Sequence, residues 1–178
     1  VDAETVTIAD CEFTGNGDHP IAGGAWPTPD RVALSRQVTI DRSTFAGNRA
    51  SLLFTDARVR IRSSRFVENG MRPEAARGAF GSTGGALTIV RSDVEITDSD
   101  FVGNGSTGLG GAILAIGARL SVTKSTFEAN AARVGGAIAS YGRPPRENIW
   151  SADELIDLPR LVIARATFDG NTADDEGG

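Results

Sequence analysis

The sequence is poor in the residue types on which many catalytic and structural sites depend. It has one cysteine, Cys11, one histidine, His19, and one lysine, Lys124. A single cysteine excludes an internal disulfide and a cysteine-rich zinc site. A Ser-His-Asp triad would have to use His19, which has no serine near it in the sequence and is better read as a turn residue before Pro20.

Charge and hydropathy exclude further classes of protein. The formal net charge is −5, which argues against a nucleic-acid interface, since such an interface needs a clustered basic face. No apolar run is long enough to span a membrane, and no basic-then-apolar pattern of a secretory leader begins the sequence. The 22 glycines imply many turns.

Residues 99–115 contain the pattern G-x-G-x-x-G, formed by Gly103, Gly105 and Gly108. A phosphate-binding loop of this kind needs a helix directly after its last glycine and an acidic residue about 20 residues further on. Here another Gly-Gly pair follows, and Lys124 stands near the place of the acid. We therefore expect this stretch to turn a corner and not to bind a dinucleotide.

One octet is repeated six times along the chain. Each copy has an aliphatic residue, a variable one, an aliphatic one, two mostly polar residues, a small residue, a variable one and Phe. The copies are 6–13, 38–45, 59–66, 94–101, 120–127 and 161–168. Three residues after each Phe stands an asparagine: Asn16, Asn48, Asn69, Asn104, Asn130 and Asn171. Gly-Gly-Ala follows four copies, whereas "RASLLF" follows Asn48.

The first half of each octet alternates like a strand, and its two polar residues predict a bend. The Gly-Gly-Ala-Ile/Leu segments predict a second short strand in each repeat. Equal repeats separated by long returns favour parallel strands stacked in coils. We therefore predict an all-β fold, a single-stranded right-handed parallel β-helix (solenoid) with loop insertions. Residues 1–178 would form one such segment, a fragment of a longer repeat region.

Stacked coils bring equivalent residues into columns. The six phenylalanines should form one internal file, each contributing about 1.5–3 kcal/mol by burial. The asparagines should pass amide hydrogen bonds from coil to coil and adopt the left-handed conformation at a corner. The sixth octet position holds small residues that fit a tight inward bend, and Cys11 is expected there as an inert buried thiol.

The pairing of F-x-x-N with G-G-A-[I/L/V] along a chain resembles the polymorphic outer membrane proteins of chlamydiae. More broadly, the repeats resemble the pectate-lyase-like parallel β-helices. The first resemblance implies a β-helical passenger domain of an exported bacterial surface protein, at the cell surface, in the outer membrane or outside the cell. It implies a role as a stalk or adhesin, with a host or cell-surface protein or glycan as partner. Open coil ends also predict end-to-end self-association.

The alternative is a polysaccharide-active enzyme of the lyase or hydrolase type, which would cluster carboxylates on one outer face. Asp10, Asp41, Asp98 and Asp100 face outward but occupy different columns or distant coils. Asp10 and Asp98 lie three coils apart, about 14 Å by the strand spacing, too far to share a glycosidic bond. We therefore predict no catalytic residues, no metal site and no cofactor.

Three insertions interrupt the repeat, at 26–37, 70–83 and 141–160. The third is the richest, because a capping box at Ser151 predicts a short helix over 152–158. It also holds residue types that dominate recognition surfaces, and these are the predicted binding residues: Tyr141, Arg143, Arg146 and Trp150. The alternative is that Trp150 and the leucines after it pack the loop onto the coil wall.

Overall fold

The computed structural model describes residues 5–17, 22–23, 36–70, 84–142 and 160–177. In these residues the regular structure is entirely β-strand. Sheet A contains β1 (Thr5–Ala9), β4 (Arg36–Asp41), β7 (Ala57–Arg62), β10 (Asp93–Thr97), β13 (Arg119–Thr123) and β17 (Arg160–Ala164). Sheet B contains β2 (Glu12–Thr14), β5 (Thr44–Ala46), β8 (Arg65–Val67), β11 (Asp100–Val102), β14 (Thr126–Glu128) and β18 (Thr167–Asp169).

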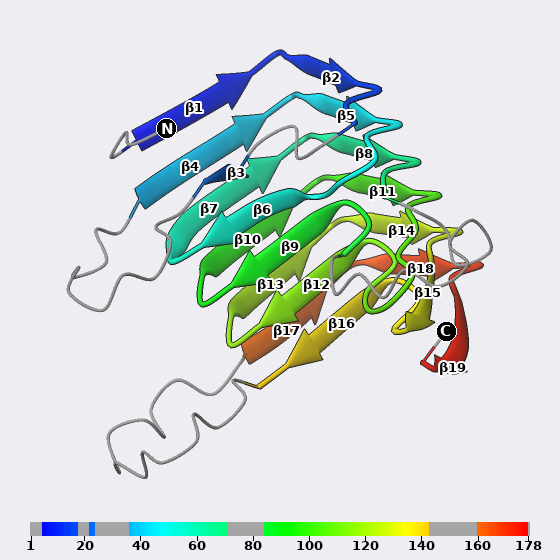
Figure 1. Cartoon of the computed structure of the whole chain (residues 1–178). Helices are drawn as coiled ribbons and strands as arrows, with labels where there is room; N and C mark the ends of the chain where they lie inside the picture. The colour runs from blue at the N-terminus through cyan, green and yellow to red at the C-terminus, as the bar shows by residue number, and fades with distance from the viewer. Residues whose placement is uncertain (1–4, 18–21, 24–35, 71–83, 143–159, 178) are drawn as a thin grey trace, which may run out of the picture.

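Two further sheets complete the fold. Sheet C contains β3 (Ala22–Gly23), β6 (Leu52–Thr55), β9 (Leu87–Val90), β12 (Ile113–Ile116) and β16 (Ile138–Tyr141). A small sheet pairs β15 (Ala131–Val134) with β19 (Thr172–Glu176). Every pairing is parallel and joins equivalent strands of successive coils (Figure 1).

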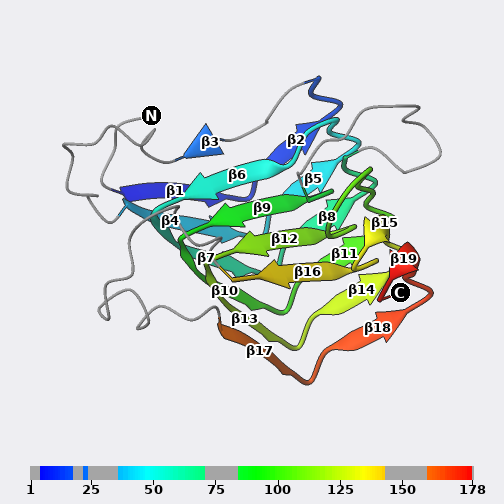
Figure 2. The same cartoon turned by 60° about the horizontal axis from the view of Figure 1, so that its bottom comes forward.

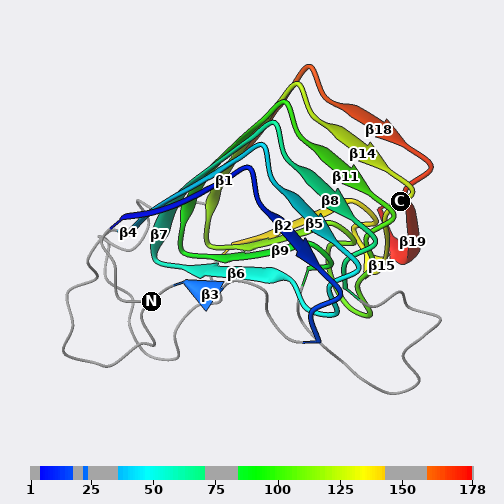
Figure 3. The ribbon, with the colours of Figure 1, turned by 90° about the horizontal axis from the view of Figure 1, so that it is seen from above.

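Seen along its axis, the chain turns through sheets A, B and C in each of the first five coils and encloses a roughly triangular core (Figure 3). Equivalent residues of neighbouring coils lie from 21 to 41 residues apart, yet they remain in register. The unequal lengths of chain between equivalent strands therefore do not change the register of the coils. This arrangement confirms the predicted parallel β-helix.

The bend inside each octet is a backbone corner between sheets A and B. The fifth octet residue has a positive φ, between 43° and 54°, in all six coils: Asp10, Arg42, Ser63, Asp98, Lys124 and Arg165. Residues with a side chain rarely adopt this left-handed conformation, because Cβ crowds the backbone. The corner must therefore be held by other interactions.

A ladder of serine hydroxyls supplies these interactions at the sixth octet position. The backbone N–H of Ser43, Ser64 and Ser99 each donates to the serine Oγ of the next coil, at 3.2 Å. Each of those Oγ atoms also donates to the carbonyl oxygen two residues before it, as Ser99 does to Thr97 at 2.9 Å. The sixth position is thus selected for its hydroxyl as well as for small size.

The phenylalanines form the predicted internal file. Neighbouring rings from Phe13 to Phe168 are stacked, with centroids 4.7–5.1 Å apart and planes within 5° of each other. Phe45, Phe66 and Phe101 are fully buried. The centroid spacing equals the strand spacing of about 4.8 Å, so the file follows directly from the register of sheet B.

The asparagines form a continuous amide ladder, as predicted. The Oδ1 of Asn104 accepts from both the N–H and the Nδ2 of Asn69, each at 3.0 Å. The Nδ2 of Asn104 donates to the carbonyl oxygen of Phe66 and to Oδ1 of Asn130, each at 2.9 Å. The same pattern recurs from coil to coil.

The expected left-handed conformation of the asparagines is wrong. It belongs to the residue before each asparagine, where φ lies between 51° and 64°: Gly15, Gly47, Glu68, Gly103, Ala129 and Gly170. The backbone therefore turns at the residue before each asparagine, and the asparagine side-chain amide points inward, where it forms the ladder.

The Gly-Gly pairs of the third to fifth coils lie where coils approach closely, and strands β9, β12 and β16 begin directly after the alanine that follows each pair. A Cβ on Gly111 would lie 1.8 Å from the carbonyl oxygen of Gly136, and one on Gly85 would lie 2.0 Å from that of Gly111. In these three coils the Gly-Gly-Ala residues themselves are therefore a turn, and the residues after them form the predicted strand. The G-x-G-x-x-G stretch belongs to this corner, since strand β12 follows it and no helix does.

Candidate functional site

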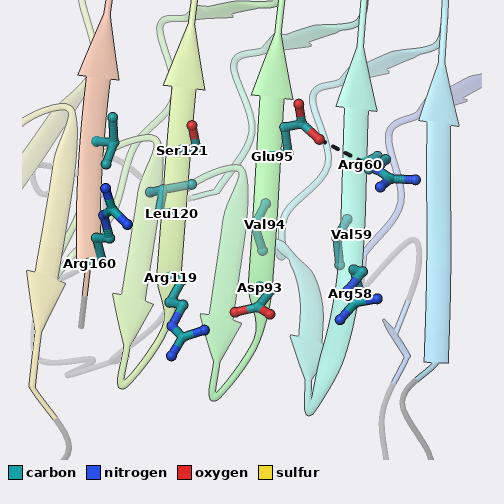
Figure 4. A pocket seen from close by; sticks show the side chains of 11 residues that line it. Arg58, Val59, Arg60, Asp93, Val94, Glu95, Arg119, Leu120, Ser121 and Arg160 are labelled. Atoms are coloured by element: carbon teal, nitrogen blue, oxygen red, sulfur yellow. Dashed lines mark ion pairs between the residues drawn. The ribbon is translucent and has the colours of Figure 1, made fainter. Parts of the chain in front are cut away.

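The outer face of sheet A carries a strip of charged side chains, which we call the arginine strip. It consists of Arg58, Arg60, Asp93, Glu95, Arg119 and Arg160. One row of the strip is formed by register partners on β7, β10, β13 and β17, where Arg58 pairs with Asp93, Asp93 with Arg119, and Arg119 with Arg160. Figure 4 shows these side chains on neighbouring strands.

The strip lines a shallow groove of about 470 Å³, to which Ser121 and Val162 also contribute. Arg60 and Glu95 form an ion pair across the groove, with Nε 3.4 Å from Oε2, and each side chain is about half exposed (Figure 4). The groove is therefore lined by charged groups and a hydroxyl together with the apolar residues Val59, Val94, Leu120 and Val162. It lies within the size range of small-molecule sites.

The strip has the opposite sign of charge from the whole chain. Its four arginines and two carboxylates give a net charge of +2, whereas the chain carries −5. Arg119 and Arg160 are direct register partners, and like charges in this position repel each other. In the described residues neither Arg58 nor Arg160 has an ion-pair partner. The strip therefore has more basic than acidic side chains.

Other arginines are engaged in ion pairs between coils. Arg42 donates from Nε and Nη2 to the two carboxylate oxygens of Asp10, each at 2.8 Å, and also bonds Asp41. These hydrogen bonds hold the pKa of Asp10 below its ordinary value and raise the pKa of Arg42. Both side chains are exposed, so the pair contributes little to stability.

A second corner carries the same bidentate arrangement. Arg91 donates from Nε to Oδ1 of Asp56 at 2.8 Å and from Nη2 to Oδ2 at 2.5 Å, and its pKa is raised by these bonds. Both residues have positive φ. Ion pairs of this kind link adjacent coils at their corners, so we assign them a structural role.

Of the outward carboxylates, Asp10 and Asp41 both bond the guanidinium of Arg42, whereas Asp98 and Asp100 have no part in that ion pair. Asp10 and Asp98 share the corner column, but Arg42 and Ser63 of the intervening coils lie between them. Asp100 faces outward from sheet B and accepts a hydrogen bond from Thr126 at 2.6 Å. Within the described residues, no group of three or more His, Cys, Asp or Glu side chains could hold a metal ion.

Of the predicted binding residues, only Tyr141 lies in the described part of the chain. It ends strand β16 and is 39% exposed. Arg143, Arg146 and Trp150 lie outside the described residues, as do the helix predicted over 152–158 and most of the other two insertions. Strands β3 and β16 belong to the same parallel sheet and lie four coils apart in it (Figure 2).

Cys11 is not the buried thiol that its octet position predicted. It is exposed, because it belongs to the first coil and no described coil covers it. Its Sγ lies 3.1 Å from the carbonyl oxygen of Ala9, the same bond that serine hydroxyls make in later coils. Position in the stack, and not residue type, determines its exposure.

Sequence reasoning missed the arginine strip, although a signal was present. Arg58, Asp93, Arg119 and Arg160 each stand one residue before an octet. Aligning the octets therefore places them in one column. This column is not evident from residue type, because outward positions vary between coils. Only the alignment of the octets shows which outward residues become neighbours.

In-register coils with internal Phe and Asn ladders and one charged outer face define a β-solenoid repeat protein. Within it, residues 98–116 match the family model described as the Chlamydia polymorphic membrane protein (Chlamydia_PMP) repeat. The chain thus contains this repeat, which confirms the resemblance in the part that carries F-x-x-N and Gly-Gly-Ala. A comparison with curated proteins found no match. Among the described residues there is no helix long and apolar enough to cross a membrane.

Proposed function

We propose that this chain is a non-catalytic, passenger-type β-helix of an exported bacterial surface protein, which holds a binding surface away from the cell as a stiff stalk. The polymorphic membrane protein repeat at 98–116 carries this proposal, because that repeat is named for a membrane protein family. The continuous register of sheets A and B over six coils supports the proposed role as a stiff stalk.

Stiffness follows from the way the coils are joined. Each step of the stack carries backbone ladders, a phenylalanine contact and an asparagine amide bond, and the central steps add serine hydroxyl bonds. Neighbouring coils are therefore linked on three sides of a packed core. A solenoid with these links transmits force along its axis without bending at a single weak joint.

The adhesin-like part of the proposal assigns recognition to the outer surface. The arginine strip and the third insertion, with Tyr141, Arg143, Arg146 and Trp150, are the candidate contact residues. A host or cell-surface protein or glycan is the proposed partner class. Nucleic acid is not a proposed partner, because the chain carries a net negative charge.

Two measurements test this function. Labelled chain should bind to the surface of target cells saturably, and antibodies against it should stain intact, unpermeabilised bacteria that produce the protein. Incubation with acidic and neutral polysaccharides should release neither unsaturated nor reducing ends. Measurable turnover would refute the non-catalytic assignment and favour a lyase or hydrolase.

We also propose that a second copy covers the open face of the last described coil. Leu161, Ile163 and Phe168 are 41%, 42% and 44% exposed there, whereas their equivalents in the preceding coil are buried. They line a hollow of about 400 Å³ with Ile138 and Asn171. Sedimentation should show concentration-dependent association that Leu161→Asp abolishes, and a monomer at all concentrations would refute this contact.

A further inference from the structure

We propose that Asn16 is a site of spontaneous deamidation, in which the backbone of the chain itself converts the side-chain amide to a carboxylate. The sequence Asn-Gly occurs at 16–17, 69–70 and 104–105. All three asparagines belong to the amide ladder, so one reactive sequence is present in three different coils. The structure distinguishes the three sites by exposure and by hydrogen bonding.

Asparagine is a thermolabile residue, and a following glycine favours its reaction because glycine has no Cβ to obstruct the attacking backbone nitrogen. Here the nitrogen of Gly17 would lose its proton and bond to Cγ of Asn16. The Cγ–Nδ2 bond breaks, and its nitrogen leaves with that proton as ammonia. The cyclic imide then takes up a water molecule and opens to aspartate or isoaspartate. No group is oxidised or reduced, and water is the co-reactant.

The attacking nitrogen is held by the backbone at two of the three sites. The N–H of Gly70 donates to the carbonyl oxygen of Asn48 at 2.7 Å, and that of Gly105 donates to the carbonyl oxygen of Asn69 at 2.8 Å. The N–H of Gly17 makes no such bond with any described residue. Gly17 is also exposed. Its nitrogen can therefore approach the side chain of Asn16 without breaking a backbone hydrogen bond.

The reacting amide is also least restrained at the first site. The Nδ2 of Asn16 makes one described hydrogen bond, to Oδ1 of Asn48, and the residue is exposed. Asn69 and Asn104 are buried, and the side chain of each takes part in four hydrogen bonds. Reaction at either buried site therefore requires local opening of the stack, and its rate falls with the small fraction of molecules that are open.

Deamidation would change the end of the ladder. A carboxylate accepts hydrogen bonds without donating any, so the product loses the bond from Nδ2 to Oδ1 of Asn48 and brings acceptors together. The isoaspartate product also adds a carbon atom to the backbone at residue 16, where the carbonyl oxygen accepts from the N–H of Arg49 at 2.8 Å. The first coil, β1 and β2, should therefore loosen from the second. The site would act as a slow, irreversible switch, whatever the outer surface binds.

The test compares the three sites within one molecule. The purified 178-residue chain is incubated at physiological temperature in water enriched in heavy oxygen, and its peptides are then identified by mass spectrometry after digestion in ordinary water. The peptide that contains Asn16 should gain label. Those that contain Asn69 and Asn104 should gain it at least about tenfold more slowly, because several buried hydrogen bonds must break first. In guanidinium chloride the three rates should become similar.

Gly17→Ala is the variant that obstructs the attack. A Cβ at this position meets nothing within 4 Å, so the fold should be kept, as circular dichroism would confirm. Label uptake at residue 16 should nevertheless fall several-fold, because the methyl group obstructs the attacking nitrogen. Hydrogen exchange of the converted native chain should increase over residues 5–17 and stay unchanged over residues 94–102.

Three results would overturn the inference: no label at residue 16 of the folded chain in the time that the unfolded chain reacts fully, equal rates at the three sites of the folded chain, or unchanged uptake in Gly17→Ala. Label at residue 16 without faster exchange over residues 5–17 would confirm the modification site and refute the switch. The comparison of folded with unfolded chain needs no variant, so the test stays decisive if Gly17→Ala folds poorly.

Discussion

Replacement of Asn104 by alanine tests whether the amide ladder holds the coils together. Asn104 is fully buried and its side chain takes part in four hydrogen bonds, two accepted from Asn69 and two donated to Phe66 and Asn130. Alanine leaves the buried N–H of Asn69 without its acceptor and removes the two donated bonds. An orphaned buried donor costs about 1–3 kcal/mol and each further bond about 1 kcal/mol, so we expect a loss of about 3–5 kcal/mol in unfolding free energy.

The matched control is Asn16→Ala, which makes the same substitution in the same column at the end of the stack. Asn16 is exposed, and the only side-chain bond described for it runs from Nδ2 to Oδ1 of Asn48. We therefore expect a loss below about 1 kcal/mol. Urea denaturation followed by circular dichroism gives both values, since unfolding free energy falls linearly with denaturant.

Hydrogen exchange locates the effect. In Asn104→Ala the amide of Asn69 should lose protection, whereas the amide of Asn48, which donates to Oδ1 of Asn69, should keep most of its protection. Equal destabilisation by Asn104→Ala and Asn16→Ala, or unchanged exchange at Asn69, would show that the ladder merely accompanies the stacking and does not stabilise it.

Three further substitutions test other parts of the stack. Gly111→Ala should destabilise by more than about 2 kcal/mol, because Cβ would lie 1.8 Å from a carbonyl oxygen, whereas Gly17→Ala meets nothing within 4 Å and should be nearly neutral in thermal melts. Phe101→Ala should cost about 3–5 kcal/mol in urea titrations, and Phe168→Ala, at 44% exposure, clearly less. Asp10 has a pKa held below 3.8 by a guanidinium of the next coil. Its small stabilisation is therefore complete above that pH and lost as the pH falls through the lowered pKa, so the native chain and Asp10→Asn should converge in stability in acid and differ slightly at neutral pH.

The inward half of the fold was predictable because it repeats. Phe45, Phe66 and Phe101 occupy the same octet position, and stacking equal coils places them in one file whatever the lengths of the segments between them. The asparagine ladder follows from the same alignment. In contrast, the left-handed corner falls on residues as different as Asp98 and Lys124, so no residue preference reveals it.

The candidate site was less predictable because outward residues are not constrained by packing. Arg119 and Asp93 come together only when the octets are aligned, since 26 residues separate them in the sequence. The exposure of Cys11 likewise depends on its place in the stack and not on its octet position. The predicted binding residues all lie in the third insertion, and of them the structure describes Tyr141 alone.

The asparagine ladder runs in a single direction. At each step the backbone N–H of one asparagine donates to Oδ1 in the coil that follows it along the chain. Among the described residues, one extremity of the rod thus presents an acceptor, the Oδ1 of Asn16, and the other a donor, the N–H of Asn171. A two-fold symmetric joint would oppose like groups, so only a polar, head-to-tail junction continues these bonds. The rod consequently has an intrinsic sense, like an arrow, and material added to it must point the same way.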